Sequence, residues 1–118
     1  MNIRFKAKSS SGEPYAVEVS TGPNGIRVFC HCPAGVVRQL CKHKVALIRG
    51  DGAILADPEQ ASSLAELKQS PEWAFLAKRL NLLEKELEAI EKEKTTLAKR
   101  ARALKANFGR ELAEGIRV

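Results

Sequence analysis

All three cysteines and both histidines of this 118-residue chain lie between positions 30 and 43. Cys30 and Cys32 are separated by one residue, and after eight further residues Cys41 and His43 repeat that separation. Three thiolates and one imidazole form a complete tetrahedral set for zinc, with no position left for water. Such a closed set is typical of a structural site rather than a catalytic one. The sequence therefore predicts one structural Zn²⁺ as the cofactor.

The spacing of these residues restricts the backbone around them. Two residues on the same face of a regular strand lie ~6.6 Å apart, whereas two sulfurs on one zinc lie only ~3.8 Å apart. The strand that carries Cys30 and Cys32 must therefore bend or end, and Pro33 supplies the end. Residues two apart on a helix point to opposite sides. We therefore expect Cys41 just before a helix and His43 in its first turn.

The order of these ligands resembles that of the SWIM zinc finger, in which Cys-x-Cys and a variable spacer precede Cys-x-His. The matching residues are Cys30, Cys32, Cys41 and His43, and the resemblance covers roughly residues 14–50. It implies a ββα unit, zinc binding, and binding of DNA or of proteins. The resemblance does not choose between these two kinds of partner.

Other interpretations of the cysteines are buried apolar thiols, or a disulfide with one thiol left over. The odd number and the ligand spacing argue against both. A Cys–His nucleophile is a third possibility, but no orienting Asn or Asp is identifiable and the metal already claims every thiol. We therefore expect neither an enzyme nor a small-molecule substrate. His31 alternates to the strand face opposite Cys30 and Cys32, which indicates a surface residue and not a fifth ligand.

Three stretches of alternating apolar and polar residues, 3–8, 15–20 and 26–32, predict a three-stranded antiparallel sheet. The turns between them are rich in Gly, Pro, Ser and Asn. The helix after Cys41 is expected to pack on this sheet and to end at Gly50. The predicted fold class is α+β, a SWIM-like zinc-finger domain over residues 1–52. A core this small usually needs a structural metal.

Helix signals dominate the rest of the chain. Residues 53–70 are predicted to be a linker with a short helix that starts at Asp57, an N-cap followed by Pro. Residues 71–108 contain no Gly or further Pro and are predicted to be one long helix. The C-terminal stretch 109–118 carries too little signal to assign.

The long helix carries a heptad repeat. Apolar residues recur at 3-4 spacing from Trp73 to Phe108, interrupted by Lys94. A 50-residue domain cannot bury such a seam, so the pattern predicts a homodimer through a coiled coil. The alternative is that the first turns pack on the chain's own domain and the rest frays. The predicted oligomerisation residues are Leu76, Leu80, Leu83, Leu87, Ile90, Leu97 and Leu104.

Charge along that helix slightly favours an antiparallel pair. Residues 84–93 are mainly acidic and residues 94–105 mainly basic, so an antiparallel arrangement places one over the other. A parallel pair would set Glu86 against Glu91. Exposed ion pairs contribute only ~0.2–1 kcal/mol each, so the preference is weak.

The formal net charge of +6 and the pI of about 9.5 suit an anionic partner. Residues 1–50 hold eight Lys/Arg against two Asp/Glu. We therefore expect this part to bind nucleic acid, DNA in particular, with a protein-interaction adaptor as the alternative. Charges that only keep the protein soluble are the simplest alternative for this surface. The candidate binding residues are Arg4, Lys6, Lys8, Arg27, Phe29, His31, Lys42, Lys44 and Arg49.

Targeting signals are not apparent. The start of the chain has no apolar run typical of a signal peptide, and no segment is apolar enough for a membrane helix. Cysteines that bind metal rather than pair suit a reducing compartment. The expected location is the cytoplasm, or the nucleus in a eukaryote, without a membrane partner.

Overall fold

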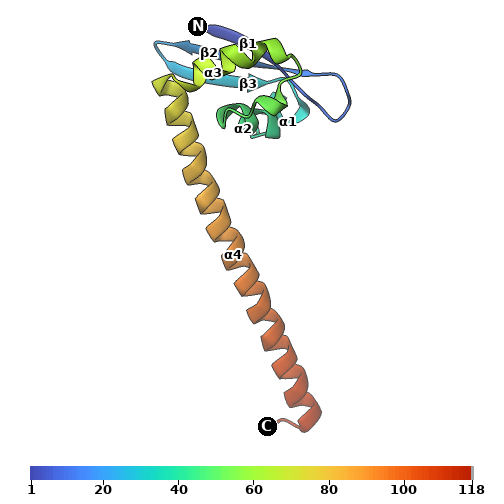
Figure 1. Cartoon of the computed structure of the whole chain (residues 1–118). Helices are drawn as coiled ribbons and strands as arrows, with labels where there is room; N and C mark the ends of the chain where they lie inside the picture. Colours follow the sequence, from blue (N-terminus) through green and yellow to red (C-terminus); the bar gives the residue numbers. More distant parts are fainter. Residues whose placement is uncertain (118) are drawn as a thin grey trace. The chain divides into compact units, whose positions relative to one another are not determined.

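The structure is a computed structural model that describes residues 1–117. Three strands come first and helices follow (Figure 1). The chain divides into two compact units, Met1–Leu80 and Asn81–Val118. We call the first unit the head. Residues 81–114, the part of the last helix that lies in the second unit, are called the distal helix.

The sheet is an antiparallel meander in the order β1-β2-β3, as the alternation predicts. The strands are β1 (Asn2–Ala7), β2 (Tyr15–Gly22) and β3 (Gly25–Cys30). Residues 23 and 24 alone connect β2 to β3, and Gly25 takes the positive φ of +100° that this tight turn requires. β3 ends at Cys30, two residues earlier than expected, because the backbone turns into the next helix there.

The sequence signals for helix starts are confirmed. Asp57 accepts a hydrogen bond from the backbone of Glu59, and Pro58 follows it at the first helical position. The helical elements are α1 (Pro33–Val36), α2 (Lys42–Ile48), η1 (Gly52–Ile54), η2 (Pro58–Gln60), α3 (Ala61–Lys68) and α4 (Pro71–Glu114).

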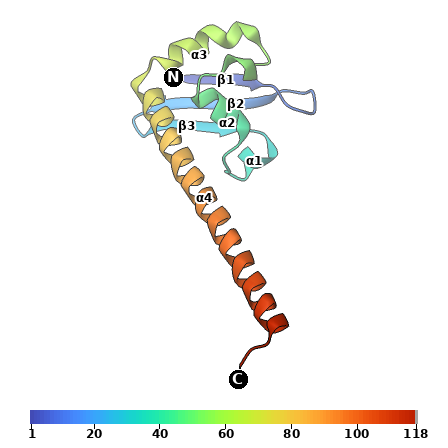
Figure 2. The same ribbon diagram turned by 60° about the horizontal axis from the view of Figure 1, so that its bottom comes forward.

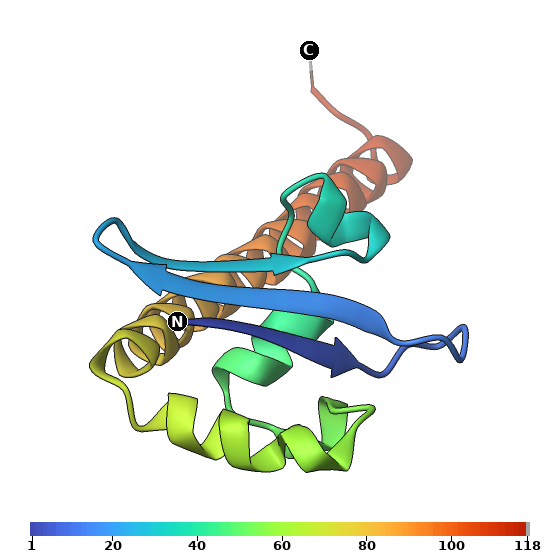
Figure 3. The same ribbon diagram turned by 90° about the horizontal axis from the view of Figure 1, so that it is seen from above.

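The segment 53–70 belongs to the head and is not a linker. Leu55 forms a β-bridge with Ala7, and the backbone N–H of Lys8 donates to Ile54 at 2.7 Å. The side chain of Gln60 completes the edge: its Oε1 accepts from the Lys6 N–H, and its Nε2 donates to the carbonyl of Arg4. The segment thus closes the outer edge of β1, beside which α3 lies (Figure 3).

One face of the sheet carries the core, and α2 covers it (Figures 1 and 2). Trp73, from the first turn of α4, is 1% exposed and donates its indole N–H to the carbonyl of Leu47 in α2 at 3.2 Å. This bond ties α4 to the helix that follows Cys41. The buried apolar residues around it are Phe5, Ala7, Val17, Val19, Leu47, Leu55, Leu64 and Leu67.

The long helix α4 starts at Pro71, as predicted, but continues through Gly109 to Glu114. A glycine inside a helix weakens it by only ~1 kcal/mol, and good helix formers surround Gly109. The stretch 109–114, left unassigned from the sequence, is therefore helical. In the described residues, no helix is long and apolar enough to span a membrane.

The heptad seam is covered up to Leu80 and exposed after it. Leu80 is 5% exposed and the partly buried Leu76 packs against the core, so the head covers Leu80 and part of Leu76 within a single chain. These two residues are therefore less available to a second chain than the positions that follow them. The remaining large apolar residues of the seam are exposed, namely Leu83, Leu87, Ile90, Leu97, Leu104 and Phe108.

Candidate metal centre

Four side chains meet between the end of β3 and the start of α2. Cys30 is the last residue of β3 and Cys32 is the N-cap of α1. Cys41 is the N-cap of α2, and His43 lies in its first turn, as the spacing predicts. Their ligand atoms all lie within 4.8 Å of one another, and all four residues are buried. They are positioned to bind one metal ion.

Backbone amides help to hold two of the sulfurs. The N–H of Gly35 donates to Cys32 Sγ at 3.2 Å, and the N–H of Lys44 donates to Cys41 Sγ at 3.5 Å. Both sulfurs thus occupy the N-cap position of a helix, where backbone N–H groups stabilise negative charge. The two caps aim the thiols toward each other.

Gly35 is a residue of the site that sequence reasoning missed. A Cβ at this position would lie 2.0 Å from the carbonyl oxygen of Cys30, so no other residue fits without moving the backbone. This close approach presses α1 against the end of β3 and brings Cys32 beside Cys30. The sequence could have indicated this role, because a glycine directly after Cys32-Pro33-Ala34 suggests a close approach of the backbone in the tight turn there.

His43 faces the cluster with one nitrogen. Its Nδ1 lies 3.6 Å from Cys30 Sγ, whereas its buried Nε2 has no hydrogen-bond partner among the described residues. Burial and the positive charge of Lys42 lower the pKa of His43, although the backbone of Lys8 slightly opposes this. The imidazole is therefore neutral, which is the form that binds a metal.

Two of the thiols, those of Cys30 and Cys32, differ in how readily they ionise. Burial is the largest effect on Cys30 and raises its pKa to about 12. Burial also opposes ionisation of Cys32, but the Gly35 amide and the neighbouring thiols outweigh it, and the pKa of Cys32 is lowered. The thiolate form is thus favoured at Cys32 and disfavoured at Cys30. No disulfide joins the three cysteines. Their free thiols and the neutral imidazole fit a soft divalent metal.

Figure 3 looks onto the face of the sheet opposite α2, which we call the outer face. The register pairs Arg4 with Glu18 and Glu18 with Phe29, so these side chains share one face. The faces of β1 and β3 therefore coincide, as the nucleic-acid hypothesis requires. Lys6 and Arg27 lie on the same face by alternation.

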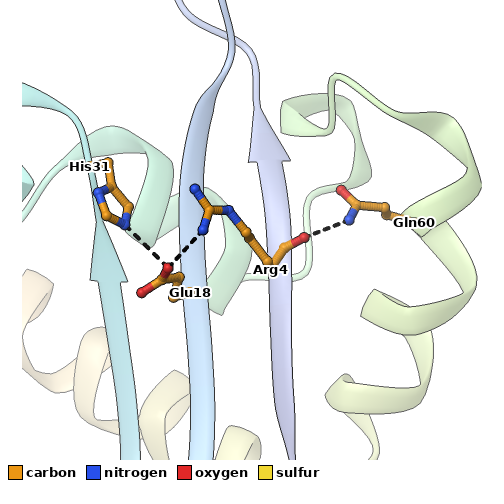
Figure 4. Close-up of polar contacts among 4 residues, drawn as sticks. All are labelled: Arg4, Glu18, His31 and Gln60. Carbon is orange, nitrogen blue, oxygen red and sulfur yellow. Dashed lines mark hydrogen bonds and ion pairs between the residues drawn. The ribbon is translucent and has the colours of Figure 1, made fainter.

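Glu18 lies in the middle of this face and was not anticipated. Its Oε1 lies 3.1 Å from the Arg4 guanidinium and 3.4 Å from His31 Nε2 (Figure 4). Its alternation against the buried Val17 and Val19 could have revealed it. Arg4 and His31 therefore already have an anion beside them, and the outer face is less positive than its cations alone suggest.

The other candidates have no ion pair with Glu18 in the described residues, although Phe29 is its cross-strand neighbour. The guanidinium of Arg27 lies 5.1 Å above the ring of Phe29, and the ring of His31 meets Phe29 edge-on at 5.0 Å. The Lys44 ammonium donates to the carbonyl of Gln39 at 2.7 Å. The remaining candidates, Lys8, Lys42 and Arg49, are all exposed, Lys8 just after β1 and the other two on α2 and at its C-cap.

Comparisons with models of known families, with characterised proteins and with solved structures found no match. The likeness to the SWIM zinc finger thus rests on the four ligand residues and their context. The metal cluster itself rests on the geometry of the fold.

Proposed function

We propose that this chain is a SWIM-like zinc module that binds nucleic acid without catalysis and self-associates through the distal helix. The observation that carries the proposal is the buried cluster of Cys30, Cys32, Cys41 and His43 beside a basic sheet. Zinc suits this cluster because it prefers tetrahedral sets of thiolate and imidazole. The ion joins the end of β3 to the start of α2, and with four protein ligands it has no position for a substrate.

Charge supports nucleic acid as the partner. Arg4, Lys6 and Arg27 lie on the outer face of the sheet against the single carboxylate of Glu18. Phosphate contacts by such cations release condensed counterions, which gives an affinity that falls steeply with salt. The simplest test of this proposal therefore measures how the affinity changes with salt concentration. DNA is the first ligand to test, as duplex and as single strand.

The experiment is a mobility shift with generic duplex and single-stranded DNA at two salt concentrations. Changing Arg4, Lys6 and Lys8 together to Ala should weaken binding to all sequences. On duplex, the salt slope should flatten by about 0.9 for each phosphate that the variant no longer neutralises. A wild-type protein that retains its metal but binds no nucleic acid at low salt contradicts the proposal.

A substitution of Glu18 should strengthen nucleic-acid binding instead of weakening it. Glu18→Gln removes the carboxylate between Arg4 and His31, so nucleic acid should bind a few-fold more tightly at low salt. The gain should shrink as salt rises, because screening weakens the repulsion that was removed. Unchanged affinity would show that nucleic acid does not contact this face.

A protein-interaction adaptor is the second candidate, and one observation favours it. A hollow of about 460 Å³ in the head is lined in part by Ile26, Pro71, Phe75 and Leu76, and Phe75 is 59% exposed. An exposed aromatic residue beside apolar neighbours is typical of a protein-docking surface. A partner bound there should tolerate salt, which separates it from a phosphate ligand.

Self-association is supported by the exposed seam of the distal helix. Leu87, Ile90, Leu97 and Leu104 are each more than half exposed in the single chain. A second copy is the proposed cover, because the seam keeps heptad spacing and its acidic and basic halves complement each other in an antiparallel pair. A dimer would also present two heads to one nucleic acid.

A further inference from the structure

A groove runs along the free edge of β3, beside the metal centre. Its volume is about 370 Å³, and we call it the β3 groove. Three of its lining residues are cationic, and none is a carboxylate. The lining residues are Arg27, Val28, Phe29, Gly35, Arg38 and Lys44.

The backbone of Val28 is open toward this groove. The N–H of His31 donates to the carbonyl of Ala16 in β2 at 3.0 Å. In an antiparallel pair every second residue points its N–H and carbonyl to the neighbouring strand, so this bond shows which residues of β3 face β2. Phe29 and Arg27 then direct their backbone groups to β2, whereas Val28 directs its N–H and carbonyl outward. The groove therefore offers a backbone N–H donor in addition to its charges.

Arg38 is held in an unusual conformation. Its φ is +64°, and it is the sole non-glycine residue with a positive φ in residues 1–117. Local bonds maintain this turn: the N–H of Arg38 donates to Gly35, and the N–H of Gln39 donates to Ala34. Asn or Gly would adopt this backbone more readily than Arg. A strained residue whose side chain lines a groove points to a role for that side chain.

The other two cations are also positioned by neighbours. Lys44 donates its ammonium to the carbonyl of Gln39, which holds it near the turn that carries Arg38. Arg27 stacks on the ring of Phe29. None of the ion pairs found in residues 1–117 engages Arg27, Arg38 or Lys44. The groove differs in this respect from the outer face, where Glu18 sits between Arg4 and His31.

We propose that the β3 groove binds a phosphate of a nucleic-acid backbone, with Arg38 and Lys44 as its main contacts. Arg27 would share the contact, and Phe29 would position Arg27 by stacking rather than bind a base. This site rests on the proposed function and specifies where the head holds its ligand. The backbone N–H of Val28 is the additional donor, as is common where phosphates meet protein backbone.

A polymer of phosphates fits better than a single phosphorylated side chain. Arg27 lines the β3 groove and also a hollow of about 470 Å³ on the outer face, which Arg4 and its ion-pair partner Glu18 line as well. The two hollows therefore share one cation, and a backbone with successive phosphates can follow both. A phosphopeptide would use the β3 groove alone.

The test compares two double variants of the full chain. Arg38→Asn with Lys44→Gln removes the groove cations, and Asn is chosen because it tolerates the positive φ at this position. Lys85→Gln with Lys99→Gln is the matched control, because it removes the same charge from exposed positions of the distal helix. Both proteins should retain one metal per chain, which shows that the head is folded.

Binding is measured by fluorescence anisotropy with oligo(dT) at several salt concentrations. The groove variant should bind about tenfold or more weakly at low salt, and on this single strand its salt slope should be flatter by about 0.7 for each phosphate no longer neutralised. The control should bind within about twofold of wild type. A groove variant that binds like the control overturns the groove but leaves the proposed function intact.

Two further outcomes separate the groove from the proposed function. A wild-type protein that binds no oligonucleotide at low salt overturns both. A phosphoserine peptide is titrated in parallel as the rival ligand. If it binds wild type more tightly than oligo(dT) does, and the groove variant no longer binds it, the assignment to nucleic acid is overturned.

Discussion

The head and the distal helix share one heptad seam but treat it differently. Trp73 and Leu80 are buried within a single chain, whereas Leu87 and Leu97, at equivalent spacing, are more than half exposed. The head closes its own apolar surface with a sheet, α2 and a metal cluster. The distal helix has no such cover in the single chain. Periodicity therefore identifies an apolar face but does not identify what covers it.

The largest loss of stability should follow removal of the metal that joins β3 to α2 in the head. Cys41→Ser should release zinc and unfold the head, because structural zinc contributes ~10–16 kcal/mol of apparent binding energy in small domains. Metal analysis and the fluorescence of Trp73, the single tryptophan, measure the two consequences.

His31→Ala is the matched control, because His31 lies next to two ligands but outside the cluster. It should retain one zinc per chain and the buried environment of Trp73. A Cys41→Ser protein with an intact head, or wild type folded without metal, would contradict the structural role of the cluster.

The next effect tests whether the first turns of α4 belong to the head. Trp73→Ala should lower the free energy of unfolding of the head by ~3–5 kcal/mol, since it removes a fully buried ring. Trp73→Phe should lose only the bond to the Leu47 carbonyl and some packing, ~1–2 kcal/mol. Urea denaturation followed by zinc release to a chelator measures both.

Phe75→Ala is the control for these variants, because Phe75 is exposed two residues further along the same helix. It should change stability by no more than ~0.5 kcal/mol. Equal losses of stability for Trp73→Ala and Phe75→Ala would mean that α4 does not contribute to the core of the head.

The local parts of this site could be predicted from the sequence. The spacing of Cys41 and His43 excludes the middle of a helix, and the structure places both at the start of α2 as expected. The strand was also expected to end near the first two cysteines, but it ends at Cys30, and Pro33 begins α1 instead. Alternation likewise predicted the three strands, because burial of one face imposes a period of two. These inferences need only the geometry of a few consecutive residues.

The parts that failed depend on contacts between distant segments. Nothing local in 53–70 shows that Gln60 will bond to Arg4 and Lys6 across the edge of β1. Nothing local in the heptads shows that Leu47 will accept a bond from Trp73. The positive φ of Arg38 also gave no sequence signal, since Arg is not a residue that favours it.

A third prediction addresses the distal helix alone. Leu87→Asp should weaken the proposed dimer at least ~100-fold, because each chain loses ~1.5–3 kcal/mol of apolar burial. The stability of the head should not change. Leu82→Asp is the matched control, because Leu82 is similarly exposed but lies off the seam. Analytical ultracentrifugation at several protein concentrations measures the association.

The association of the wild-type chain tests whether the seam of the distal helix, unlike that of the head, is covered by a second chain. A wild-type chain that stays monomeric at high micromolar concentration would mean that the seam is not an interface between copies. Equal losses of affinity for Leu87→Asp and Leu82→Asp would mean that the chains associate through another surface of the helix.

The smallest expected energy difference is that between parallel and antiparallel orientations of the two helices, because it comes from surface charges alone. In a parallel pair Glu86 would face Glu91 and Arg100 would face Lys105, so both contacts would be repulsive. In a staggered antiparallel pair Glu86 meets Arg100. Each contact is worth only ~0.2–1 kcal/mol, so several must act together to set the direction.

A nitroxide label at Lys78 reads this direction from the distance to its mate. An antiparallel pair that matches Glu86 with Arg100 is centred near residue 93, so the two labels lie about 30 residues apart along the axis. At ~1.5 Å per residue this is ~45 Å, whereas parallel chains bring the labels within ~20 Å. Pulsed electron resonance distinguishes the two values, and high salt should broaden the distribution because it screens the charges that set the direction. A short distance at low salt would show that apolar packing, not charge, orients the chains.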